Sequence, residues 1–457
     1  MSRKLVEMIC HPGEMTALIG MYSAAKAAAK LPSDPDLAFC YSMLTEVSRS
    51  FAIVIQQLPN PLRDAIAIFY LVLRGLDTVE DDMAIPVAEK LPQLLSFHKD
   101  IYDKSYTSSC GYNHYKRLMS NFGHVIRVFL SLDPSFQKVI ADITRRMGEG
   151  MAEFIEKEVK TLEDYNKYCH YVAGLVGIGL SELFASSHLE SEHFRSDLEN
   201  ANHMGLFLQK TNIIRDYLED VTEIPAPRMF WPREVWGLYA AQLDEFKEPV
   251  NRTAAVQCLN HLIGDALQHL PRCIDYMESI RHPQVFRFCA IPQIMAAATL
   301  SMCYNNGAVF EGVVKMRRGK TAVVFHKCNH MGDLLTWFID FLSVLRAKAA
   351  DQADPRDPTL PTTAAAIAAH MQLCKEKLRT WEKANPTSKS ALSIVRDYGA
   401  LTLTGTYAYY ACGLSGDNEL PVFLQPYASA LQQHRQLQQV LSVAMLLLVL
   451  LFVLSRR

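Results

Sequence analysis

The sequence predicts an all-α protein whose functional centre is built from two acidic helices. Two acidic clusters share one spelling, D-x-x-E-D, at residues 77–81 and 216–220. Each cluster lies in an apolar segment with helical periodicity, and the alternating patterns typical of strands are nearly absent. Prolines and N-cap residues divide the chain into helix-length pieces, which predicts about a dozen helices packed around a central space.

The helix boundaries follow from capping residues and prolines. One long helix is expected to begin at Asn60-Pro61, run past the first cluster and stop before Pro86. Asp133-Pro134 begins another, and Thr161 with Asp164 forms a capping box that opens the helix containing residues 168–187. Further helical segments are expected at residues 36–58, 113–131, 193–222, 252–280, 284–310 and 329–350.

Composition excludes several classes of protein. The 457 residues are 49 % hydrophobic and 21 % charged, which allows a large core. The formal net charge of -2 argues against a nucleic-acid partner, which would require a basic surface. The 11 cysteines are scattered and include no C-x-x-C pair, a pattern typical of reduced thiols in the cytosol.

The last residues predict a membrane anchor. Residues 440–454 are apolar apart from Ser442 and are followed by two arginines. Fifteen helical residues span only about 22 Å, but a thin membrane and outward-reaching flanking side chains would close the gap. The alternative is a buried terminal helix. The expected organisation is a catalytic domain at 1–350, a connector at 351–436 and an anchor at 437–457, with the catalytic domain facing the cytosol.

The acidic clusters predict a metal site. On a helix, positions i, i+3 and i+4 share one face, so like charges accumulate there. A single cluster would be read as an ion-paired surface helix, whereas two copies, each next to an arginine, indicate bound cations. Mg²⁺ binds one or two carboxylates together with water and substrate phosphates. The candidate ligands are Asp77, Glu80, Asp81, Asp216, Glu219 and Asp220.

Polar residues near the clusters suit a diphosphate. Tyr70 and Arg74 share a helical face with the first cluster, and Gln209 and Asn212 lead into the second. Arg49, with its neighbour Ser48, needs an anionic partner if it is buried, and either a diphosphate or a structural carboxylate would serve.

Three further segments each allow two interpretations, a functional role or a role in packing. Residues 168–179 place three glycines in a helix at about 1 kcal/mol each, which indicates close helix packing or a bulky ligand. Tyr168 there is either a core tyrosine or a group acting on the substrate. Phe288 is either core or part of an aromatic wall around a cation. The basic run 315–320 is either solvated or a site for a phosphate-bearing cofactor.

Taken together, these strings resemble the squalene synthases. The resemblance rests on D-T-V-E-D-D, Y-C-H-Y-V-A-G-L-V-G, M-G-L-F-L-Q-K-T-N-I-I-R-D-Y-L-E-D, F-x-F-C-A-I-P-Q and V-V-K-M-R-R-G, in that order over residues 36–325. It implies the isoprenoid synthase fold with a deep central cavity. It also implies condensation of two farnesyl diphosphates to presqualene diphosphate, then reduction to squalene, the committed step to sterols, with NADPH and Mg²⁺.

The resemblance also implies roles for individual residues. The six cluster carboxylates would bind metal. The diphosphate contacts would be Ser48, Arg49, Tyr70, Arg74, Gln209, Asn212 and Arg215. The catalytic residues would be Tyr168, Tyr171, Phe288 and Arg74, and the NADPH phosphate contacts would be Lys315 and Arg317.

The expected setting is the endoplasmic reticulum membrane, with a monomeric enzyme held by its C-terminal helix. The sequence departs from the family at residues 221–229, a longer and more proline-rich loop, and after about residue 326. Two other functions remain open. A phytoene-type synthase would share the clusters but need no nicotinamide, and a membrane-tethered acidic scaffold would bind divalent ions without turnover.

Overall fold

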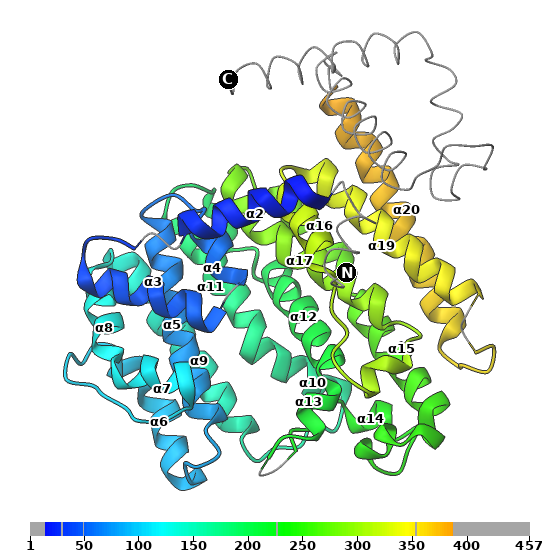
Figure 1. Ribbon diagram of the computed structural model, residues 1–457, viewed down its shortest axis with the longest axis horizontal. Helices are drawn as coiled ribbons and strands as arrows, with labels where there is room; N and C mark the ends of the chain where they lie inside the picture. Colours follow the sequence, from blue (N-terminus) through cyan, green and yellow to red (C-terminus); the bar gives the residue numbers. More distant parts are fainter. Residues whose placement is uncertain (1–13, 29–30, 49, 225–226, 352–353, 387–457) are drawn as a thin grey trace, which may run out of the picture. The chain divides into compact units, whose positions relative to one another are not determined.

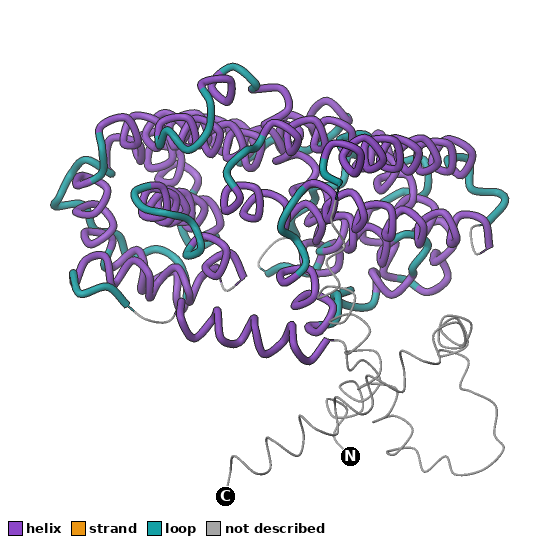
Figure 2. Tube along the Cα trace, turned by 90° about the horizontal axis from the view of Figure 1, so that it is seen from above, coloured by secondary structure: helices purple, strands orange, loops and turns teal. Residues whose placement is uncertain are grey.

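The computed structural model describes residues 14–28, 31–48, 50–224, 227–351 and 354–386. All regular secondary structure in these ranges is helical, which confirms the predicted all-α class (Figure 2). Thr16–Asn385 form one compact unit.

The helices follow one another with short connections. The α-helices are α2 (Met15–Ala28), α3 (Pro35–Ser48), α4 (Ser50–Ile55), α5 (Leu62–Asp81), α6 (Val87–Asp100), α7 (Asn113–Ser120), α8 (Phe122–Ser131), α9 (Pro134–Phe154), α10 (Leu162–Cys169), α11 (Leu175–Ser186), α12 (Leu198–Arg215), α13 (Tyr217–Val221), α14 (Arg233–Trp236), α15 (Arg252–Leu267), α16 (Leu270–Ser279), α17 (Pro283–Cys303), α18 (Arg318–His326), α19 (Met331–Asp351) and α20 (Leu360–Ala384). Short turns of other helical types are η2 (His170–Gly174), η3 (Glu192–Arg195), η4 (Leu243–Lys247), η5 (Pro249–Asn251) and η6 (Gly307–Phe310).

Helix α12 lies at the centre of the unit. It packs against α11, α15, α16 and α17 (Figure 1). Its buried residues lie on more than one face, from Ala201 through Phe207 to Ile214. A helix surrounded in this way is expected to be apolar on most of its surface. The second acidic cluster therefore follows directly from a central helix.

Two glycines let the continuous segment of η2 and α11 approach α12 to backbone contact. A Cβ on Gly177 would lie 2.3 Å from the carbonyl oxygen of Ala201, and one on Gly205 would lie 2.2 Å from that of Ala173. Any larger residue would push the helices apart. This contact accounts for Gly177, one of the three glycines at residues 168–179 that each cost about 1 kcal/mol in a helix. Gly174 lies against Asn202, and Gly179 lies against Ile143 and Phe69.

Several helix starts agree with the sequence and others do not. Thr161 and Asp164 form the predicted capping box, and the Asp133 side chain accepts from the Ser135 backbone N–H. The predicted cap at Asn60 is wrong, because Pro61 is the N-cap of α5 and no side chain caps it. The segment 193–222 is not continuous either, since α12 ends before Asp216 and α13 follows.

The compact unit extends beyond the boundary expected at residue 350. Helix α20 packs against α19, α15 and α16, so the first part of the expected connector belongs to the same unit. The expected anchor at 437–457 lies outside the described residues. Within those residues, Leu162–Ser186 and Pro283–Cys303 are long and apolar enough for a membrane span, but most of each is buried in the fold.

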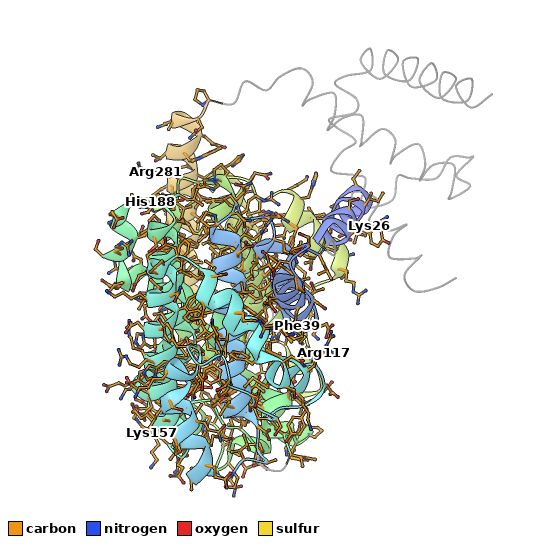
Figure 3. The ribbon with its side chains drawn as sticks, turned by 90° about the vertical axis from the view of Figure 1, so that its left-hand side faces the viewer. Lys26, Phe39, Arg117, Lys157, His188 and Arg281 are labelled. Carbon is orange, nitrogen blue, oxygen red and sulfur yellow. The ribbon has the colours of Figure 1, made fainter. Side chains whose placement is uncertain are left out.

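Charged side chains lie mainly at the periphery, where labelled examples point outward (Figure 3). Arg117 pairs with Glu46 at 2.5 Å, and Lys157 pairs with Asp164 at 2.8 Å. The nine cysteines of the described ranges are all free and buried.

Candidate active site

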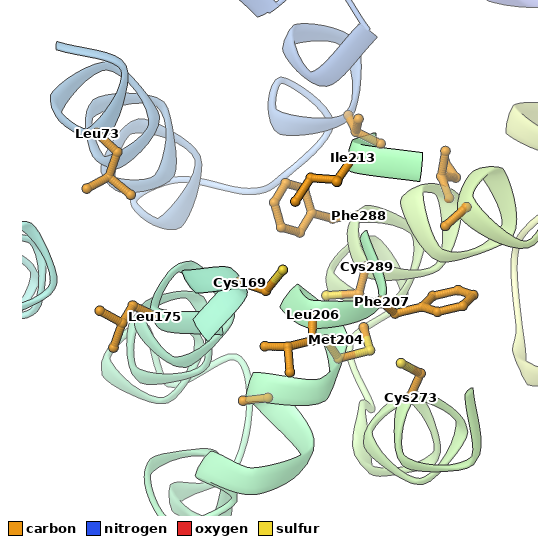
Figure 4. Close-up of a cluster of buried hydrophobic side chains, with 14 of the residues drawn as sticks. Leu73, Cys169, Leu175, Met204, Leu206, Phe207, Ile213, Cys273, Phe288 and Cys289 are labelled. Atoms are coloured by element: carbon orange, nitrogen blue, oxygen red, sulfur yellow. The ribbon is translucent and has the colours of Figure 1, made fainter. Parts of the chain in front are cut away.

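A large apolar cavity lies between α5, α11, α12 and α17. It contains about 1160 Å³ of space not filled by atoms, counting its open mouth. Its walls combine residues far apart in the sequence, and Leu73, Met204 and Phe288 come from three different helices around the same buried cluster (Figure 4). A cavity of this size and apolarity suits a long hydrocarbon ligand.

The charged groups that line this cavity gather toward one end. Arg74 and Asp77 on α5 and Asn212 on α12 line it together. The two acidic clusters lie close to these residues in the sequence. Asp77 belongs to the first cluster, at the end of α5, and Asn212 lies one turn before Asp216, which follows the last residue of α12. The first cluster and Asp216 thus lie at helix C-termini, where the helix dipole is negative and a cation is favoured, whereas Glu219 and Asp220 lie on α13.

The first cluster is partly neutralised by arginines. The Arg74 guanidinium lies 3.4 Å from the Asp77 carboxylate and 3.5 Å from the Tyr70 hydroxyl. Burial raises the pKa of Asp77 to about 6, although Arg74 opposes the shift. Burial and the neighbouring Asp81 carboxylate raise the pKa of Glu80 to about 8. Crowded, desolvated carboxylates of this kind favour a bound cation.

Arg228 joins the two clusters, and sequence reasoning missed it. Its guanidinium lies 2.6 Å from Asp81 and 3.5 Å from Glu80, while its backbone N–H donates to the carbonyl oxygen of Asp220 at 2.8 Å. The two clusters therefore face one region instead of separate surfaces. The residue lies in the proline-containing loop after α13, where no local motif marks it.

The second cluster carries its own arginine. Arg215 donates to both carboxylate oxygens of Asp216, at 2.7 and 2.5 Å. Burial raises the pKa of Asp220 to about 7, against the lowering effect of Arg228. Among the described residues, no three His, Cys, Asp or Glu side chains converge as a ready metal cage. Mg²⁺ does not need one, because water and substrate phosphates complete its shell.

Tyr168 lies beside the first cluster. Its ring stacks on Phe230 at 4.9 Å and meets Phe154 edge-on at 5.4 Å. Phe230 in turn carries the Arg228 guanidinium 5.0 Å above its ring. Burial, followed by the charge of Glu80, raises the pKa of Tyr168 well above its ordinary value, so the phenol stays neutral.

Comparison with known proteins decides the family. The family model for squalene/phytoene synthases matches residues 44–320, a stretch that contains both clusters and the Tyr168 motif. The chain belongs to the squalene/phytoene synthase family. Among its relatives, squalene synthase LSS of Botryococcus braunii is 56 % identical over 336 residues, 74 % of this chain and 73 % of that protein. Squalene synthase 1 of Arabidopsis thaliana is 54 % identical over 343 residues, 75 % and 83 % of the two chains.

A solved structure supports the same family assignment. A ligand complex of TcSQS superposes with a TM-score of 0.73 at 46 % identity and covers 75 % of this chain and 99 % of that one. The isoprenoid synthase fold implied by the resemblance is thereby confirmed.

Not every residue predicted for the site is brought to it. Tyr70, Arg74, Asp77, Asn212 and Phe288 line the cavity. Neither Tyr168 nor Tyr171 is among the lining residues. The Tyr171 hydroxyl donates to Glu153 at 3.1 Å, a carboxylate that also pairs with Lys157 and Lys167. The π-helical turn at His170–Gly174 changes the register after Tyr168. The two tyrosines of the motif therefore have different neighbours: Tyr168 packs among aromatic rings, and Tyr171 bonds to a surface carboxylate.

The remaining predicted contacts lie nearby or outside the described ranges. Ser48 is the last residue of α3, and its hydroxyl donates to the Leu44 carbonyl; Arg49 lies outside the described residues. Gln209 is half-buried on α12, and Glu219 is exposed on α13. Lys315 is exposed and Arg317 is half-buried, and both lie in the connection between η6 and α18. Phe310, the last residue of η6, has its ring 5.1 Å from that of Tyr217 on α13.

The raised carboxylate pKa values make metal-free stability depend on pH. Between the unfolded and folded pKa values, the folded protein binds more protons than the unfolded chain, so stability falls as pH rises through the folded values. In EDTA, we expect the Tm to decrease from about pH 7 to about pH 8.5 and Mg²⁺ to stabilise most at the upper end. Differential scanning fluorimetry measures both effects.

The window above pH 7 separates these carboxylates from the buried histidines. Burial lowers the histidine pKa values, so these side chains have released their protons by then; the residues are His203, His261, His269 and His370. Glu80→Gln serves as the matched variant and is expected to flatten the decrease. Burial also raises the pKa values of cysteines such as Cys169 and Cys273, which lower stability in the same direction as pH rises. A decrease as steep in Glu80→Gln as in the wild type would therefore contradict the carboxylate assignment.

Proposed function

We propose that this chain is a squalene synthase that joins two farnesyl diphosphates into presqualene diphosphate and reduces it with NADPH to squalene. One observation carries the proposal: Asp77 of the first cluster lines the polar end of an apolar cavity, and Arg228 ties that cluster to the second one. The identity of 54–56 % to the squalene synthases named above supports the same activity.

The residues at the polar end fit magnesium and a diphosphate. Asp77, Glu80 and Asp81 from one side and Asp216, Glu219 and Asp220 from the other supply hard oxygen ligands. Mg²⁺ bound there would neutralise diphosphate oxygens and make the diphosphate a better leaving group. Arg74 and Arg215, already oriented by carboxylates, add fixed positive charge where negative charge develops on departure.

Tyr168 is the residue assigned to the proton step of the first condensation. It is neutral, so it accepts a substrate proton only while passing its own to an oxygen acceptor such as the released diphosphate. Its stacking between Phe230 and Phe154 fixes the ring and leaves the hydroxyl as the adjustable group. The apolar walls keep water away from allylic cations that it would capture as alcohols.

Lys315 and Arg317 are the proposed contacts for the phosphates of NADPH, which supplies the hydride of the second step. Their charge suits phosphate oxygens, and their connection runs from the second cluster region to α18. The proposed location is the endoplasmic reticulum membrane, reached through the apolar residues 440–454. Such an anchor would keep the cavity close to the bilayer that receives the product.

Product analysis tests the function directly. The full chain in detergent is incubated with farnesyl diphosphate, Mg²⁺ and NADPH, and hydrocarbons are extracted. Squalene is the expected product, and presqualene diphosphate is expected to accumulate without NADPH. A phytoene-type enzyme would be indifferent to NADPH, and a scaffold would bind Mg²⁺ and return the substrate unchanged; either result would refute the proposal.

A further inference from the structure

The cavity extends away from the acidic clusters along α12 and α11, toward Leu180 and Phe184. Helices α11 and α12 run antiparallel, because Gly205 meets Ala173 while Gly177 meets Ala201. At 1.5 Å per residue, the path from Asn212 to Gly205 and on from Ala173 to Ser181 covers roughly 20 Å. That depth suits one extended farnesyl diphosphate with its phosphates at the acidic end.

Aromatic rings form the floor at this depth. Phe184 and Tyr276 line the cavity there, and Phe288 meets Phe184 edge-on at 6.1 Å on the side wall. Phe194 supports the floor from behind, with its ring 5.3 Å from Tyr276 and 6.4 Å from Phe184. A close-packed floor of this kind yields little to an added group, because overpacking costs about 1–3 kcal/mol.

Tyr276 is held in place by a directed pair of hydrogen bonds. The Ser181 hydroxyl donates to the Gly177 carbonyl at 3.0 Å, which uses its single proton. The 2.6 Å contact between Ser181 and Tyr276 must therefore have Tyr276 as the donor. Both residues are buried, at 0 % and 2 % exposure, so breaking this bond would leave polar groups unsatisfied.

We propose that Tyr276 is the specificity-determining residue that limits the length of the prenyl chain this enzyme accepts. The ring blocks the far end of the cavity, and the bond to Ser181 prevents it from turning aside. A geranylgeranyl chain, one isoprene unit longer than farnesyl, would have to displace it. This inference rests on the proposed function and adds a determinant for its substrate.

Removing the Tyr276 side chain tests this role. In Tyr276→Ala, the ratio of kcat/KM for geranylgeranyl diphosphate to that for farnesyl diphosphate is expected to rise at least about tenfold, the scale of discrimination that a fitted apolar pocket gives per methylene. Geranylgeranyl thiodiphosphate with Mg²⁺ should also raise the Tm of this variant more than that of the wild type. Tyr276→Phe retains the ring but loses the bond to Ser181, so its selectivity should rise less than that of Tyr276→Ala.

Tyr304→Ala is the matched control, because this fully buried tyrosine does not line the cavity. It should lower the Tm without changing selectivity, which separates a loosened fold from an opened floor. If Tyr276→Ala does not fold, Tyr276→Leu decides instead. Unchanged selectivity in a folded variant overturns the inference, whereas a wild type that forms no product from farnesyl diphosphate overturns the proposed function itself.

Discussion

Asp77→Asn and Asp216→Asn, made separately, should each abolish turnover of farnesyl diphosphate. Each substitution keeps the shape of the side chain but removes a negative oxygen from one cluster. Losing even an outer-shell partner of a metal costs about 10–100-fold, so losing a direct ligand should exceed about 100-fold in kcat/KM. Steady-state formation of presqualene diphosphate and squalene is the measurement.

Asp142→Asn provides the control for these variants. Asp142 lies on the surface of α9, where it pairs with Arg145 and Arg146, and it does not line the cavity. It should behave like the wild type. If Asp77→Asn or Asp216→Asn retained substantial activity, the two clusters would not form one catalytic centre.

Tyr168→Phe should stop the first condensation while leaving the fold intact. The ring that stacks on Phe230 remains, and only the hydroxyl that handles the proton is removed. Loss of a positioned proton-transfer group costs on the order of 10²–10⁴ in rate. Single-turnover formation of presqualene diphosphate measures this step apart from the reduction that follows.

The chain offers a close control in the same motif. Tyr171→Phe removes a hydroxyl that donates to Glu153 outside the cavity, and activity should stay within about threefold of wild type. A large loss in Tyr171→Phe, with Tyr168→Phe active, would reverse the roles assigned to the two tyrosines.

The acidic centre could be predicted because the spacing of its carboxylates can be read from a few neighbouring residues in the sequence. The spacing of Asp77, Glu80 and Asp81 puts three carboxylates on one helical face, and the same spelling recurs after α12. The capping box at Thr161 is equally local. The sequence cannot say that the helices approach each other, and that knowledge comes from the resemblance and the fold.

Residues whose roles depend on contacts between distant parts of the chain could not be predicted. Arg228 reaches the first cluster only because the loop after α13 turns back, and its neighbourhood spells nothing distinctive. Tyr276 gains its position from contact with Ser181, ninety-five residues earlier in the chain. The turn at His170–Gly174 inserts an extra residue that a regular helical projection of Tyr171 does not anticipate.

The glycine contact between α11 and α12 affects whether water can enter the cavity through its wall. Where Gly177 meets Ala201 and Gly205 meets Ala173, the partition consists of main chain, which has no rotamers to open. Thermal fluctuation of side chains cannot create a side entrance at that seam. Reactive carbon centres are thus sheltered there by a barrier whose tightness does not depend on which substrate occupies the chamber.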